Sequence, residues 1–170
     1  MDFSNGYDDI ASEFMAVRSK TIGVSVVRAW SESLGVHSKI LDIGCGDGIP
    51  VTQVLIESGH SVFAIDASPS LIEAFKQRFP DTPARCQAVE DSDFFNEKFD
   101  GVVASGLIFL LNESKQRDLI WRVGEILRPG GQFLFSAPIQ LDTWIDKLTG
   151  KESCSLGKAE YIDSLEASGM

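Results

Sequence analysis

The sequence predicts an α/β fold, a doubly wound and mainly parallel sheet, on three observations. Short apolar runs alternate with amphipathic stretches of helical length from Lys39 onward. The first run, Ile40 to Ile43, breaks into three glycines at alternate positions and then reaches Pro50, a residue suited to a first helical turn. The next apolar run ends in an acid, Asp66, at roughly the separation that a βαβ unit needs to bring both strand ends to one ligand.

Length and composition indicate one globular domain. The chain has 170 residues, of which 44% are hydrophobic and 24% charged, and such a chain buries about two thirds of its unfolded surface. No apolar run approaches the roughly 20 residues of a membrane span, and the N-terminal region carries acids where a signal peptide is basic and apolar. We expect a single domain over residues 1–170, no membrane partner and a cytoplasmic location.

Charge and cysteine spacing argue against two kinds of site. The net charge of −10 disfavours a nucleic-acid partner, because contact with phosphates relies on clustered lysines and arginines. The three cysteines have no metal-ligand or Cys-x-x-Cys spacing, so we expect reduced thiols and no metal site. A small-molecule substrate is favoured instead.

The spacing of the glycine loop decides between ligands. A dinucleotide fingerprint reads Gly-x-Gly-x-x-Gly, whereas this loop reads Gly44-Cys45-Gly46-Asp47-Gly48 and follows Asp42-Ile43. The string resembles motif I of the class I S-adenosylmethionine (SAM)-dependent methyltransferases, a Rossmann-like family whose loop holds the methionine part of SAM. The resemblance implies a SAM site that includes Asp42, Gly44, Cys45 and Gly46. The alternatives are a glycine turn that only packs helix on strand, and a Cys45 that is a small packing residue.

The acid after the second strand fits the same site. The strand is expected over residues 61–65 and ends in Asp66. A carboxylate accepts from both ribose hydroxyls at once, and we place Asp66 and the following Ala67 in the cofactor site. The alternative is an acid that only initiates the next helix, Leu71 to Phe79, for which Ser68 is a suitable N-cap.

Residues 1–37 are expected to form an N-terminal cap of two helices. Apolar residues fall on one face at helical spacing in both, and the second stripe consists of Ile22, Val26, Ala29 and Trp30.

The first cap helix resembles a helix that closes over SAM in small-molecule methyltransferases, with the pattern Tyr-x-x-x-Ala-x-x-Tyr/Phe-x-x-x-Arg. Here the pattern reads Tyr7, Ala11, Phe14 and Arg18. The resemblance implies that the Tyr7 hydroxyl and the Arg18 guanidinium reach the SAM carboxylate, for which a charged donor fork is well suited. Core packing of Tyr7 and a solvated helix end at Arg18 are the alternatives.

The segment after the third strand, about 84–88, resembles the family's adenine-binding segment. By position it places Val89 and Glu90 at the adenine edge, although many relatives have Asp nearer position 88, where this chain has Ala88. The alternative for Glu90 is a solvated loop acid.

The fourth strand, Phe99 to Ser105, has the family's Phe-Asp-x-Val-Val pattern. Ligands of open α/β sheets lie beyond the carboxyl ends of the strands, so Ser105 should face the reacting sulfonium. A helix over 113–127 and a fifth strand over 132–136 follow, joined by a turn that resembles the family's Leu-x-Pro-Gly-Gly. The predicted strand order is 3-2-1-4-5.

The chain ends where the family's sixth and seventh strands should begin, so we expect both to be missing and the C-terminus to be truncated. The fifth strand would then be an exposed edge that a second copy, in a homodimer, could cover. Residues 142–150 should lie on the ligand side, where Trp144 either lines an acceptor pocket or packs on a short helix. A final helix is expected over 156–168.

The expected function is methyl transfer from SAM to an unidentified small molecule by in-line displacement, with S-adenosylhomocysteine (SAH) as product. Such a reaction depends on holding acceptor and methyl in line. No catalytic residue is assigned, because His37 and His60 precede strands and so belong to the opposite edge. Tyr7, Glu113 and Asp142 are weak candidates for a base. The alternative functions are a non-catalytic SAM-binding module and an NAD(P)-dependent oxidoreductase.

Overall fold

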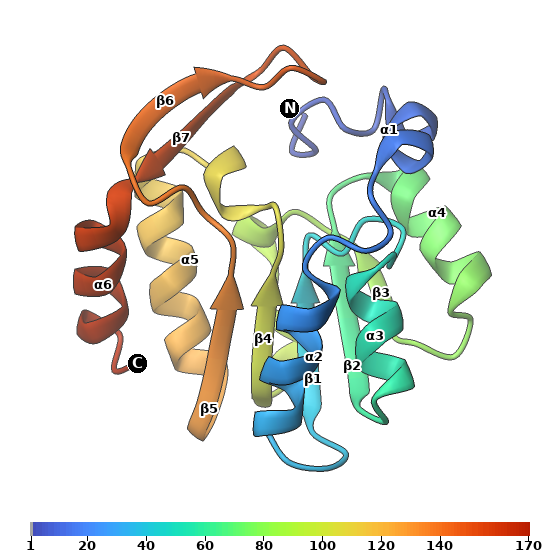
Figure 1. The fold of residues 1–170 in the computed structure, drawn as a ribbon, viewed down its shortest axis with the longest axis vertical. Helices are drawn as coiled ribbons and strands as arrows, with labels where there is room; N and C mark the ends of the chain where they lie inside the picture. The colour runs from blue at the N-terminus through green and yellow to red at the C-terminus, as the bar shows by residue number, and fades with distance from the viewer. Residues whose placement is uncertain (1) are drawn as a thin grey trace.

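The computed structural model describes residues 2–170 and contains a five-stranded parallel sheet (Figure 1). Its strand order, β3-β2-β1-β4-β5, is the predicted one. Strand β5 begins at Leu127, earlier than predicted, with a shift of register opposite Phe99 and Gly101 of β4. The strands are β1 (Lys39–Ile43), β2 (Ser61–Asp66), β3 (Ala84–Cys86), β4 (Phe99–Ala104) and β5 (Leu127–Phe135).

Helices cover both faces of this sheet, as expected of a doubly wound fold. Ile40 and Val62 pack against the helices of one face, and Leu41 and Val102 belong to the cluster that includes the other helices. Because parallel strands are buried on both faces, β1 reads as a nearly continuous apolar run. The first layer contains α2 (Val24–Ser33), α3 (Val51–Glu57) and α4 (Pro69–Arg78), and the second contains α5 (Glu113–Ile126) and α6 (Gly157–Ala167).

The N-terminal cap differs from the prediction in which face of its second helix is buried. The helix α1 (Ala11–Val17) is short, and α2 starts only after Gly23, which has a φ of +79°. Ile22 therefore precedes the helix and is 78% exposed, while Val26 is 58% exposed. Val27 is buried in their place, so the predicted stripe through Ile22 and Val26 is wrong.

Beyond the main sheet, the chain forms an antiparallel hairpin of β6 (Leu141–Ile145) and β7 (Glu152–Leu156). Figure 1 shows it above the carboxyl ends of the parallel strands. Trp144 pairs with Ser153 across the hairpin, so the expected short helix at this position is wrong. The hairpin forms its own sheet, and within residues 2–170 no strand pairs with the outer edge of β5. A second copy covering that edge stays a prediction.

Two short 3-10 helices, η1 (Val89–Asp91) and η2 (Phe94–Asn96), lie between β3 and β4, and a third, η3 (Ile108–Leu110), follows β4. Over residues 2–170, no helix combines the length and apolar character required to cross a membrane.

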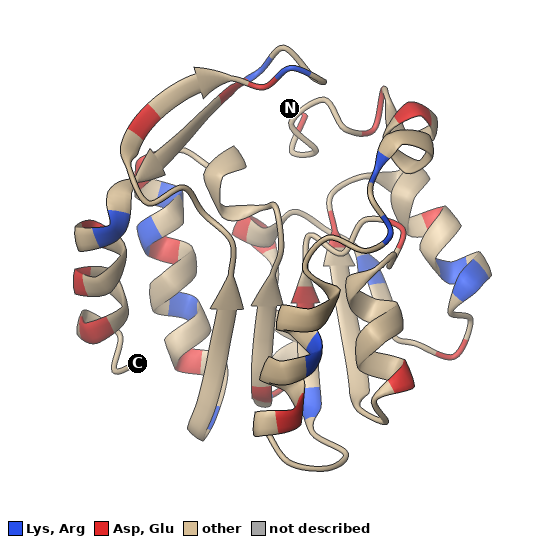
Figure 2. Ribbon diagram, viewed as in Figure 1, with Lys and Arg blue, Asp and Glu red and all other residues tan. Residues whose placement is uncertain are grey.

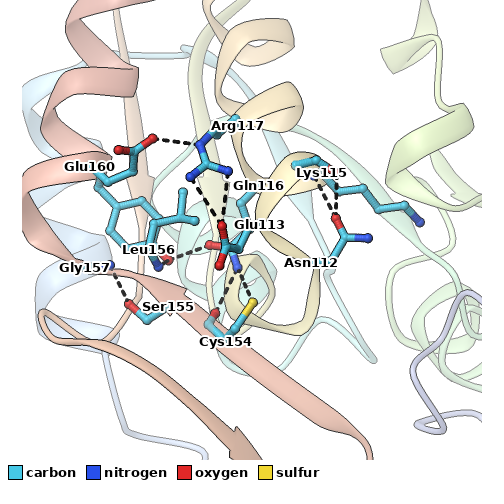
Figure 3. A network of polar contacts seen from close by, with 12 residues as sticks. Asn112, Glu113, Lys115, Gln116, Arg117, Cys154, Ser155, Leu156, Gly157 and Glu160 are labelled. Carbon is cyan, nitrogen blue, oxygen red and sulfur yellow. Dashed lines mark hydrogen bonds and ion pairs between the residues drawn. The ribbon is translucent and has the colours of Figure 1, made fainter.

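A buried polar network joins the hairpin to the helices behind it (Figure 3). Gln116 of α5 is fully buried, and its Nε2 donates to the carbonyl oxygens of Leu111 at 2.8 Å and Cys154 at 2.9 Å. Its Oε1 accepts from the Tyr161 hydroxyl of α6 at 2.6 Å. The Tyr161 oxygen in turn accepts from the Leu156 amide. One glutamine therefore connects α5, α6, β7 and the end of η3.

Gln116→Leu should lower the free energy of unfolding by about 2–4 kcal/mol, because it removes the acceptor of the buried Tyr161 hydroxyl and the amide donor to the Leu111 and Cys154 carbonyl groups. Urea denaturation measures the change. Gln77→Leu on exposed α4 surface is the matched control and should stay within about 0.5 kcal/mol of wild type. Equal effects of the two substitutions would contradict this role of the network.

Candidate cofactor site

A cavity of about 230 Å³ lies beyond the carboxyl ends of β1, β2 and β4. Its roof includes residues of an N-terminal strap, which we define as residues 2–10. Its floor includes the glycine loop, and further walls come from the segments after β2, β3 and β4. Ligands of open α/β sheets bind at this edge, so the cavity is the candidate site.

The glycine loop is tied to the end of β2 by its own backbone. The amides of Gly44 and Cys45 donate to the Ile65 carbonyl oxygen at 2.8 and 3.1 Å. Gly44 has a φ of +70°, and a Cβ there would lie 3.0 Å from Leu107 Cβ. The loop therefore needs glycine at this position for both its backbone conformation and its close approach to the segment after β4.

Asp66 lies where loop, strand and cavity meet. Its Oδ2 accepts from the Gly46 amide and its Oδ1 from the Ser68 amide, both at 2.8 Å. A carboxylate offers about four acceptor positions, so acceptor positions remain for hydroxyl groups of a ligand. Removal from water raises the pKa of Asp66, and the two amides oppose that shift. Asp66 and the neighbouring Ala67 both line the cavity.

Arg18 brings a positive charge to the other side of the loop. Its Nη1 lies 3.5 Å from the point that a Cβ on Gly46 would occupy, and its guanidinium lies 5.1 Å from the centre of the Phe14 ring. Within residues 2–170 the Arg18 side chain has no hydrogen bond or ion pair, which leaves its planar donor fork available to a carboxylate.

Two other predicted polar residues line the cavity but bind protein groups. The Tyr7 hydroxyl donates to Asp146 Oδ2 at 2.9 Å, and burial together with this bond raises the pKa of Tyr7 to about 12. Glu90 Oε1 accepts from Lys115 Nζ at 2.6 Å. Val89 and Ser105 also lie in the cavity wall, as do Gly44 and Gly46.

Asp42 and Cys45 lie outside the cavity wall and support it from below. Asp42 is buried and accepts from Thr52 Oγ1 at 2.6 Å. Burial raises its pKa to about 6, a shift that Thr52 opposes. Cys45 packs against Ile72 and Phe75, and burial raises the pKa of its thiol. The cofactor-binding roles of Asp42 and Cys45 stay predictions. From these positions, both residues would act by supporting the glycine loop and not by contacting the cofactor.

Sequence reasoning missed two polar groups of the cavity wall. The Oε1 of Gln87 and the Nδ2 of Asn5 are buried without a hydrogen-bond partner in the described part of the chain. Gln87 directly follows β3, and that position at a strand's carboxyl end was an available signal. Asn5 belongs to the strap, for which the sequence contained no comparable signal. A buried acceptor and a buried donor facing a cavity fit a polar ligand.

By its fold and by the position of this cavity, the protein is a Rossmann-like protein with a candidate ligand site at the carboxyl edge of its sheet. The family model described as "Methyltransferase domain" matches residues 40–131. The chain therefore belongs to the methyltransferase-domain family, and its fold is that of the class I SAM-dependent methyltransferases.

Relatives and solved structures agree with this assignment. An uncharacterized methyltransferase of Synechocystis is 33% identical over 95 residues, which are 56% of this chain and 44% of that protein. The chain thus spans less than half of that curated relative. The CcbJ methyltransferase of Streptomyces caelestis superposes with a TM-score of 0.75 at 15% identity, over 99% of this chain and 87% of that one. CalS10, an amino pentose methyltransferase of Micromonospora echinaspora solved with SAM, superposes with a TM-score of 0.72 at 14% identity. The superposition covers 94% of this chain and 86% of CalS10.

Asp42→Asn tests the burial of charge beneath the loop. With a pKa near 6 in the folded protein and 3.8 as the ordinary value, ionised Asp42 destabilises the fold. This destabilisation is absent below about pH 4, grows as pH rises and is complete above about pH 6. The free energy of unfolding of Asp42→Asn, minus that of wild type, should therefore increase by about 3 kcal/mol between pH 4 and pH 7. Urea denaturation at each pH measures this difference.

Asp91→Asn, at an exposed position of η1, removes the same charge from the surface and is the control. A pH profile of Asp42→Asn that parallels the profile of this control would contradict the buried-charge account.

Proposed function

We propose that this domain binds SAM and transfers its methyl group to a small-molecule acceptor. The observation that supports this most directly is the placement of an unpaired guanidinium, Arg18, and a partly satisfied carboxylate, Asp66, around one glycine loop. SAM carries a carboxylate at one end and a ribose diol further along, so the two side chains match two separate groups of one ligand.

Gln87 Oε1, which is buried without a hydrogen-bond partner in the described part of the chain, provides a third polar contact for the same ligand. In the proposed complex Arg18 holds the carboxylate of the amino-acid part, Asp66 accepts from the ribose hydroxyls, and Gln87 Oε1 accepts from the adenine amino group. Glu90, the sequence-based choice for adenine, is paired with Lys115 and is the weaker acceptor. A dinucleotide is disfavoured by the spacing of the glycines.

Bound SAM supplies a methyl carbon already activated by positively charged sulfur. The chain's own contribution is to hold the acceptor in line, within about 3–3.5 Å of that carbon. No histidine of residues 2–170 lines the cavity, and His37 contacts the Gly59 carbonyl at the opposite edge. The raised pKa of Tyr7 makes its phenol a poor base near neutral pH, and Glu113 pairs with Arg117. We therefore propose catalysis by positioning, with an acceptor that is itself nucleophilic.

A small molecule is the proposed acceptor class. Support comes from the acidic chain, with a net charge of −10, which disfavours phosphate-rich partners. The similarity to CalS10, which acts on an amino pentose, points the same way. A non-catalytic SAM-binding module is the remaining alternative, and methyl transfer to an amine or hydroxyl acceptor distinguishes the two.

Arg18→Met should weaken SAH roughly tenfold while leaving methylthioadenosine unchanged, because methylthioadenosine lacks the amino-acid carboxylate. Asp66→Asn should weaken both ligands, since both carry the ribose. Isothermal titration calorimetry measures these affinities, with NADH as the negative control. The proposal fails if wild type does not bind SAH, or if Arg18→Met weakens both ligands equally.

Gln87→Leu tests adenine recognition. Wild type should bind SAH roughly tenfold more tightly than S-inosylhomocysteine, which presents a carbonyl oxygen where adenine has its amino group. Gln87→Leu should erase that preference, whereas Gln77→Leu should retain it. A preference that survives Gln87→Leu assigns adenine recognition elsewhere.

A further inference from the structure

The strap and the tip of the hairpin, far apart in sequence, meet above the cavity. The Tyr7 hydroxyl donates to Asp146 Oδ2 at 2.9 Å, and a Cβ on Gly6 would lie 3.2 Å from Thr149 Cβ. Figure 1 shows the first described residues beside the free end of the hairpin. The strap lines the cavity, and the hairpin contacts the strap without lining the cavity itself.

The hairpin side of this contact is held firmly at both ends. Its base belongs to the Gln116 network shown in Figure 3. The Trp144 ring packs on Phe109 with 5.7 Å between ring centres. At the tip, Asp146 Oδ1 accepts from the amides of Leu148 and Thr149 at 2.7 and 3.2 Å, which holds the carboxylate in place. Asp146 is thus a fixed acceptor whose second oxygen points to Tyr7.

The strap side makes few hydrogen bonds to the rest of the described chain. The Asp2 carboxylate accepts only from groups within the strap, on Ser4 and Gly6. Within the described chain, the Tyr7–Asp146 bond is the one hydrogen bond between residues 2–7 and anything beyond the strap. The next attachment is Asp8, which accepts from Ser68 Oγ at 2.6 Å. Phe3, Ser4, Asn5 and Tyr7, all in the strap, line the cavity.

We propose that Asp146 is a positioning residue which, through Tyr7, latches the strap over the bound cofactor. The proposal rests on the SAM site proposed above and revises one part of it. Resemblance to the family assigns the Tyr7 hydroxyl to the SAM carboxylate, whereas here that hydroxyl is committed to the hairpin. Arg18 then holds the carboxylate without Tyr7, and the hairpin determines how long the cofactor stays.

The first test needs no ligand and uses amide hydrogen exchange of the whole protein. Tyr7→Phe removes only the hydroxyl and keeps the ring on Phe14, whose centre is 5.0 Å away. It should increase exchange at least several-fold in the strap and leave the five-stranded sheet unchanged. Glu152→Gln removes a carboxylate from the same hairpin that has no hydrogen bond or ion pair in residues 2–170, and should change nothing. Unchanged strap exchange in Tyr7→Phe overturns the latch.

The second test measures SAH dissociation by stopped flow. Tyr7→Phe should raise the dissociation rate roughly tenfold. Asp146→Ala, which also removes the acceptor of the Leu148 and Thr149 amides, should raise it at least as much. The double variant should not exceed Asp146→Ala, because both substitutions break the same Tyr7–Asp146 bond. Asp146→Asn keeps polar atoms at both positions and should restore much of the wild-type rate. If Tyr7 instead bound the SAM carboxylate, Asp146→Ala would leave dissociation unchanged or slow it. That outcome, or additive effects, overturns the latch.

The failure of the two proposals can be told apart. If wild type does not bind SAH, the proposed function fails while hydrogen exchange still tests the latch. If SAH binds and Tyr7→Phe releases it at the wild-type rate, only the latch fails.

Discussion

The backbone contact between the glycine loop and the end of β2 is the constraint on which the site depends. Two loop amides share the Ile65 carbonyl oxygen, and a third binds the Asp66 carboxylate. The contact requires positive φ at Gly44 and Gly46, and at Gly44 there is no room for a side chain beside Leu107. It brings the ends of β1, β2 and β4 to one point, and the cavity forms there.

This arrangement concentrates charge in a place where charge is costly. Asp42 lies fully buried beneath the loop and Asp66 beside it, and removal from water raises the pKa of both. Arg18 lowers both pKa values by its positive charge, although it is bonded to neither carboxylate. The fold thus holds two acids and one guanidinium poised around a cavity. Charge held at such a cost to stability is common at functional sites.

The roof of the cavity is built by segments outside the five-stranded sheet. The sheet and its helices bury the core and place the loop, whereas the strap lines the cavity and the hairpin contacts the strap. The two segments are attached differently: Gln116 of α5 binds the hairpin through a buried network, while residues 2–7 of the strap make one hydrogen bond beyond the strap within the described chain.

Local pattern determined the strands, the glycine loop and the acid after β2, because strand periodicity and glycine spacing depend on neighbouring residues. The resemblance to the family followed from those features, and the predicted strand order followed from that resemblance. Tertiary structure decided what lay beyond them: that Ile22 and Val26 are exposed, that residues 141–156 form a hairpin, that Glu90 is paired with Lys115, and that Tyr7 meets Asp146. These are contacts between segments distant in sequence, and no local periodicity encodes which partner a side chain will meet.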